Sequence, residues 1–292
     1  KETVALLGCI KIDMSKASKL LPLKMYDICK AINFGDGYKI VGSLLFDNND
    51  LSWKSFKGSM YGKQFKIGGY QVKTLIADID LDENNLLIKD FKVSDNAGIL
   101  SIDKIKISDL QKDKIISITS IQLREFRPSL LSKDEKNQTD IKPLLIKELD
   151  VLKINGSLND KKSIKGKGHL SFINSFKRGR TIFDVPADML SRIFGVDLEI
   201  MIPVTGFINY QIKDGKIIFT KLQDAYSESK RSKFFLLDKD MAYIDFDGNI
   251  HCNIKMKHYV LFKFTEPFVI QISGKIPKPK VNLQRKRGFL AS

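Results

Sequence analysis

The sequence predicts a mainly β protein in which a long antiparallel sheet curls into a groove like a taco shell, or alternatively forms a sandwich. Three features support this prediction. Apolar and polar residues alternate with a period of two through most of the chain, as in strands with one dry and one wet face. Gly, Asp and Asn punctuate the gaps between these segments, as in tight turns. Helical patterns separate few of the segments, which favours antiparallel meanders over βαβ units.

Residues 1–127 are predicted to form an N-terminal β unit. The segments "YKIVGSLLF", "NLLIKDFKVS" and "GILSIDKIKIS" follow one another with short polar gaps. One stretch of this half departs from the alternation. In "LPLKMYDICKAINFGDG" the apolar residues Leu21, Met25 and Ile28 lie on one helical stripe, and glycines follow it. We therefore expect a short amphipathic helix near residues 21–33.

Residues 128–143, "PSLLSKDEKNQTDIKP", are polar, charged and bounded by prolines, which predicts a long exposed loop between two β units. Residues 144–284 are predicted to form the C-terminal β unit. Residues 285–292, "RKRGFLAS", are expected to be a basic tail. Roughly fourteen strands can be counted along the whole chain.

The C-terminal unit contains two clear hairpin patterns. "FINYQIKDGKIIF" carries an Asp-Gly turn, and "AYIDFDGNIHCNIKMK" carries Asp-Gly-Asn between two alternating segments. A second amphipathic helix is expected near residues 186–194, because Asp184 suits a helix cap and Pro186 a first turn. The closing strand, "FVIQISGK", precedes Pro277 and Pro279, which lack backbone donors and blunt a sheet edge.

The composition bounds the function. The chain has 292 residues, of which 43% are hydrophobic and 28% are charged, so it is neither a disordered chain nor a helical membrane bundle. Its net charge is +15, with eight arginines among 49 basic residues. This charge fits an anionic membrane surface or a compositional bias toward lysine. It fits nucleic acid less well, because Arg dominates bidentate contacts there.

No catalytic, cofactor or metal-binding motif stands out, so we expect no enzyme activity, cofactor or metal. The glycine-rich segments lack phosphate-loop spacing, and the cysteines and histidines lack zinc spacing. Cys252 lies between His251 and Asn253, whose side chains face the other side of a strand, so a Cys–His dyad would need His258 or His169. The preferred interpretation of Cys252 is a core cysteine.

One loop has the character of an anion contact. "SFKRGRT" has one lysine and two arginines within four residues. Lys177, Arg178 and Arg180 are therefore candidates to contact phosphate, on a lipid headgroup or a nucleic acid.

The whole pattern resembles the AsmA-like family of bacterial envelope proteins, which includes the TamB and YhdP types. The resemblance rests on "KDFKVSDNAGIL" at 89–100, on "PVTGFINYQIKDGKIIF" with the later "IDFDGNI" hairpin, and on "FVIQISGKIPKPKV" at the end. The C-terminal segments are the best match and resemble the C-terminal module of the family. The chain departs from the family in having Lys275 where the closing signature has Thr, and in lacking an N-terminal anchor.

The resemblance implies a non-enzymatic protein that carries lipid acyl chains along an apolar β-groove between the inner and outer membranes. It implies a periplasmic location in the bacterial cell envelope, with anchoring through a segment outside this chain. A phospholipid or other envelope lipid is the expected ligand, with the SFKRGRT loop on anionic headgroups. The residues expected to line the groove are Ala242, Ile244, Phe246, Ile250, Cys252, Ile254, Met256, Phe268, Ile270 and Ile272.

Two alternatives remain open from the residues alone. A structural or assembly β-protein would bind an envelope protein partner through a strand edge. A nucleic-acid-binding protein would use the +15 surface, and it is the less favoured of the two.

Overall fold

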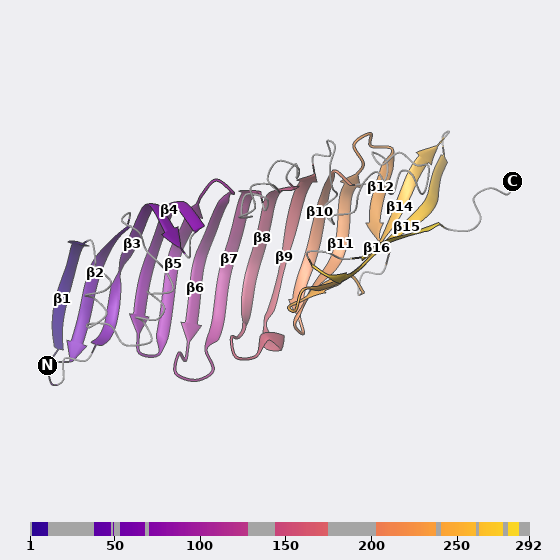
Figure 1. Cartoon of the computed structure of the whole chain (residues 1–292). Coiled ribbons are helices and arrows are strands. Elements are labelled where there is room, and N and C mark those ends of the chain that lie inside the picture. Colours follow the sequence, from indigo (N-terminus) through magenta and orange to yellow (C-terminus); the bar gives the residue numbers. More distant parts are fainter. Residues whose placement is uncertain are drawn as a thin grey trace. The chain divides into compact units, whose positions relative to one another are not determined.

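The computed structural model describes residues 2–10, 38–47, 49, 53–67, 70–127, 144–174, 203–237, 241–260, 263–276 and 280–285. Within them the chain is almost entirely strand (Figure 1), with one short 3-10 helix, η2 (Lys161–Ser163). None of the described segments forms a helix of the length and apolar character needed to cross a membrane.

The described residues form sixteen strands of one sheet. They are β1 (Glu2–Ile10), β2 (Tyr38–Asp47), β3 (Trp53–Ile67), β4 (Tyr70–Asp82), β5 (Asn85–Ser94), β6 (Ile99–Ser108), β7 (Ile115–Phe126), β8 (Leu144–Ser157), β9 (Lys165–Asn174), β10 (Thr205–Lys213), β11 (Lys216–Tyr226), β12 (Ser232–Leu236), β13 (Tyr243–Asp245), β14 (Asn249–Val260), β15 (Lys263–Lys275) and β16 (Lys280–Arg285). From β1 to β12, and again from β14 to β16, each strand pairs with the strands next to it in the sequence. β12 also pairs with β14, and β13 pairs with β11 and β14.

The predicted fold class is confirmed, because the structure is mainly β and its sheet is antiparallel. The connections are short where they are described. For example, Asp214 and Gly215 join β10 to β11, with positive φ angles of 53° and 72°. The two predicted helices, near 21–33 and 186–194, and the loop 128–143 lie outside the described residues. So does the tail beyond Arg285.

The chain divides into two compact units, and each is described by itself. Unit 1 comprises residues 1–122 and 153–159, and unit 2 comprises residues 123–152 and 160–292. The core of unit 1 lies on one face of β3, β4 and β5. It consists of buried Met60, Val72, Leu75 and Ala77, with Ile79, Ile88, Phe91 and Val93 packed against them.

A bulge in β5 keeps this core continuous. Ile88 and Phe91 are three residues apart, so strict alternation would place them on opposite faces. Asp90, between them, has a φ of +49°, and the pairing of β5 with β4 shifts at this point. The extra residue returns Phe91 to the core face. Asp224 has a φ of +47° at a similar shift in β11, so the device occurs in both units.

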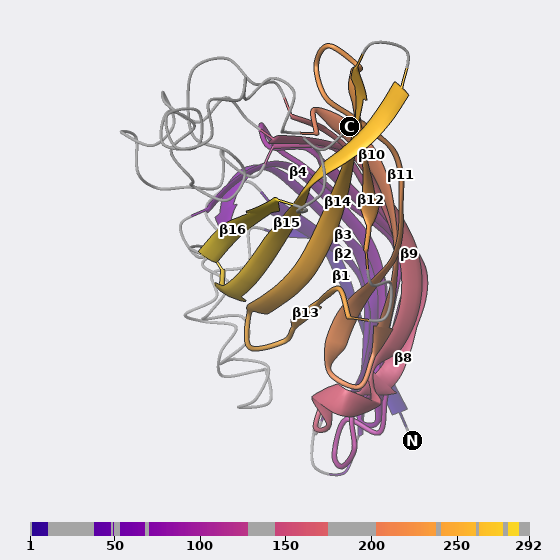
Figure 2. The same cartoon turned by 90° about the vertical axis from the view of Figure 1, so that its right-hand side faces the viewer.

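In unit 2 two short strands share one position between β11 and β14. β12 pairs with the C-terminal end of β11 and with residues 254–258 of β14. β13 pairs with residues 216–218 of β11 and with residues 250–251 of β14, at the other end (Figure 2). The sheet therefore continues from β11 to β14 through an interrupted strand.

Candidate lipid-binding face

The predicted groove residues lie together on one face of unit 2. Cys252 pairs with Ile272, Ile254 with Ile270 and Met256 with Phe268 across β14 and β15. Directly opposite residues of an antiparallel pair point to the same side. Nine of the ten predicted residues belong to two adjoining apolar clusters, which share Leu236, Ile254 and Ile270.

Phe246 and the predicted headgroup residues stand apart from these clusters. Phe246 follows β13, where its backbone N–H donates to the carbonyl of Gly215 at 3.0 Å, and its exposed fraction is 36%. Lys177, Arg178 and Arg180 lie outside the described residues.

The face extends further than the sequence predicted. Phe234 of β12 lies opposite both Ala225 of β11 and Met256 of β14. Phe172 of β9 and Leu222 of β11 belong to the same cluster. We call this side of unit 2 the apolar face; it consists of Leu170, Phe172, Ile208, Phe219, Leu222, Ala225, Phe234, Leu236, Ala242, Ile244, Ile250, Cys252, Ile254, Met256, Phe268, Ile270 and Ile272.

Two signals for these extra residues are visible in the sequence. The alternation in "GKGHLSFIN" and "GFINYQIK" places Phe172 and Ile208 on dry faces. Phe234 is harder to assign, because Phe235 follows it and the pair hides the alternation. Phe234 is completely buried, whereas Phe235 lies on the other face, opposite Lys255.

The apolar face is closely packed. Met256 and Ile272 are 1% and 2% exposed, while Ile244, Ile254 and Ile270 are only partly buried. A glycine marks one close contact. A Cβ at Gly168 would lie 2.1 Å from the backbone oxygen of Asp150 and 2.8 Å from the Tyr210 hydroxyl. Only a glycine at position 168 therefore leaves room for Tyr210 to pack over it.

Cys252 is part of this packing. It is a free cysteine and only 4% exposed, and burial raises its pKa to about 12. The thiol therefore stays protonated at neutral pH and is a poor nucleophile. His258 lies six residues along β14, roughly 20 Å away at the rise of a strand, and so forms no dyad with it.

A Ser–His contact occurs near the end of the apolar face. The Ser232 hydroxyl lies 2.8 Å from Nδ1 of His258. Ser232 has no solvent exposure, so a substrate carbonyl has no approach to its oxygen. Burial, together with the charge of Arg231, lowers the pKa of His258. The pair serves packing of β12 against β14.

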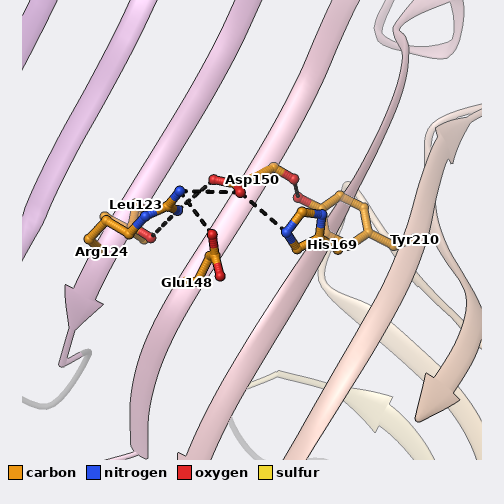
Figure 3. A network of polar contacts seen from close by, with 6 residues as sticks. All are labelled: Leu123, Arg124, Glu148, Asp150, His169 and Tyr210. Carbon is orange, nitrogen blue, oxygen red and sulfur yellow. Dashed lines mark hydrogen bonds and ion pairs between the residues drawn. The ribbon is translucent and has the colours of Figure 1, made fainter.

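A polar network, which the sequence analysis missed, joins β7, β8, β9 and β10 (Figure 3). Arg124 contacts both Asp150, through its two Nη atoms, and Glu148, with 2.9 Å between Nη2 and Oε1. Nε2 of His169 lies 3.2 Å from Oδ2 of Asp150. The Tyr210 hydroxyl donates to the backbone oxygen of Asp150 at 3.4 Å. These residues are distant in the sequence, and only the strand pairing brings them together.

The Arg124 guanidinium contacts both carboxylates of this network. Burial pushes the pKa of Asp150 up, but hydrogen bonds with Arg124 and Glu148 and the charges of Arg124 and His169 outweigh it, so the pKa lies below its ordinary value. Burial, with the charge of Asp150, raises the pKa of Tyr210 to about 12. Side-chain atoms of Glu148, Asp150 and His169 are close enough to hold a metal ion, but the Arg124 guanidinium already bridges the two carboxylates. We therefore assign the network to strand pairing.

Comparisons of this chain with family models, with curated proteins and with solved structures gave no match.

Proposed function

We propose that unit 2 is a non-enzymatic lipid-binding segment that holds acyl chains against its apolar face. The observation that carries this proposal is the extent of that face, whose apolar side chains come from β9, β10, β11, β12, β14 and β15 and from the segment around β13. An elongated apolar surface suits an elongated apolar ligand, and contacts of this kind do not distinguish one lipid class from another.

The partly exposed members of the face indicate where a chain would lie. Ile244, Ile254 and Ile270 keep some solvent exposure and come from three neighbouring strands, β13, β14 and β15. Removing such side chains from water contributes about 25 cal/mol for each Å² buried. The resemblance to AsmA-like proteins supports the further proposal that the lipid is a phospholipid or other envelope lipid carried between the two bacterial membranes.

Native mass spectrometry and lipid extraction of the chain purified from cells test this proposal. The expected result is protein with co-purified lipid. An Ile270→Trp variant should lose that lipid because it fills space on the apolar face. Gln271→Trp adds the same ring on the opposite face of β15 and should retain it. Thermal melts establish that both variants fold. If either variant does not fold, the presence or absence of co-purified lipid in the unmodified chain decides whether unit 2 binds lipid.

A second candidate function has its own supporting observation. Phe234, Met256 and Ile272 are at most 2% exposed, as in the closed core of a structural β-protein. Such a protein would act in assembly, binding an envelope protein through a strand edge. A chain that carries no lipid after purification, retains none when vesicle lipid is added, and co-purifies with a protein would favour this function and contradict lipid binding.

A further inference from the structure

The side of unit 2 opposite the apolar face carries a compact group of lysines and aromatic rings. Lys233 and Phe235 alternate along β12, and Lys255 and Lys257 along β14. Tyr226 lies across from Lys233 on β11. All five side chains are partly exposed. We call these five residues the basic patch.

The patch contains a like-charge pair. Lys233 lies directly opposite Lys257, and Lys255 directly opposite Phe235. Lys233 and Lys257 point to the same side of the sheet from neighbouring strands, so one anionic surface can contact both side chains.

The rings hold the lysines in place. Nζ of Lys233 lies 5.2 Å from the centroid of the Tyr226 ring and 5.5 Å from that of Phe235. Nζ of Lys257 lies 5.6 Å from the Phe235 centroid. Cation–π contacts of this kind occur at about 6 Å or less. The same pairing recurs on this side of unit 2, where Nζ of Lys216 lies 4.1 Å from the Tyr243 centroid.

We propose that the basic patch docks unit 2 onto an anionic lipid bilayer by contacting headgroup phosphates. Neighbouring strands are about 4.8 Å apart, so the ammonium groups can contact adjacent headgroups in one membrane plane. Tyr and Phe rings among lysines suit the interface between headgroups and acyl chains. The net charge of +15 adds long-range attraction to such a surface.

The chemistry of the patch favours a membrane over a nucleic acid. Bases stack on open ring faces, but two ammonium groups lie over the Phe235 ring. This inference goes beyond the proposed function, because docking on a bilayer requires no lipid on the apolar face.

Vesicle co-sedimentation of the full chain tests the proposal. The vesicles are phosphatidylcholine alone, or phosphatidylcholine with about 30 mol% phosphatidylglycerol, at ~0.1 M salt. We expect binding to the anionic vesicles only. Lysines near such a surface contribute enough that a Lys233→Gln, Lys255→Gln, Lys257→Gln variant should bind on the order of 100-fold more weakly. The same three positions changed to Arg should bind as the unmodified chain does.

The matched control has the same change in net charge elsewhere. Lys112→Gln, Lys161→Gln, Lys162→Gln removes three exposed lysines, one from a turn and two from η2, and it should weaken binding far less than the patch variant. The proposal is overturned if control and patch variants weaken binding equally, if uncharged vesicles bind as well, or if a single-stranded oligonucleotide binds the patch more tightly than the vesicles. The patch variant should still retain lipid in native mass spectrometry. A loss of vesicle binding by that variant therefore leaves lipid binding on the apolar face, the proposed function, to its own test.

Discussion

The two adjacent phenylalanines of β12 allow the assignment of the two faces to be tested directly. Phe234 is completely buried between Ala225 and Met256, whereas Phe235 is partly exposed among lysines on the other side. Replacing Phe234 with Ala removes a buried ring and leaves a cavity, which costs about 3–5 kcal/mol of unfolding free energy. Replacing Phe235 with Ala loses two cation–π contacts, at ~0.5–1 kcal/mol each.

Thermal melting followed by circular dichroism measures this difference. A loss of 1 kcal/mol lowers the melting temperature by about 2–4 °C in a domain of comparable size. Phe234→Ala should therefore lower it by roughly 10 °C, and Phe235→Ala by a few degrees. Equal shifts for the two variants, or a larger one for Phe235→Ala, would refute the assignment of Phe234 to the apolar face.

Three further predictions concern pH and the strand bulge. The lowered pKa of Asp150 means that its contribution to stability is present above about pH 3.8, its ordinary pKa, and is lost as the pH falls below that value and through the lowered pKa. Urea unfolding should therefore show the stability gap between the unmodified chain and Asp150→Asn narrowing as the pH falls below about 4, and a constant gap would contradict this. The pKa of His258 is lowered in the folded chain, so as the pH falls below 6.5 this histidine takes up a proton in the unfolded chain first. The free energy of unfolding should therefore decline from about pH 7.5 to about pH 5 more steeply in the unmodified chain than in His258→Asn. Parallel urea-unfolding profiles for the two proteins would contradict this prediction. Asp90 has a left-handed backbone, so Asp90→Val should cost about 1–2 kcal/mol in urea unfolding and Asp90→Gly almost nothing, whereas equal costs would exclude the bulge.

Much of the fold could be predicted because alternation and turn chemistry are local properties. The hairpin predicted around Asp247 and Gly248 appears as β13 and β14, and the one around Asp214 and Gly215 as β10 and β11. Residues predicted to lie on the dry faces of two different strands proved to be neighbours across the sheet, as Cys252 of β14 and Ile272 of β15 are.

Other features depend on contacts that no local pattern reveals. The bulge at Asp90 breaks the period of two, and a single residue in the left-handed region has only a weak sequence signature. The network of Arg124, Asp150 and His169 depends on the register of three strands. The basic patch likewise joins β11, β12 and β14, and its lysines look like an ordinary wet face when each strand is considered alone.

The position of lipid on the apolar face is the central claim, and a density map of the chain purified from cells tests it most directly. The account predicts elongated density along Ile244, Ile254 and Ile270 that no part of the polypeptide explains. A map in which the chain's own side chains fill that space completely would contradict lipid binding.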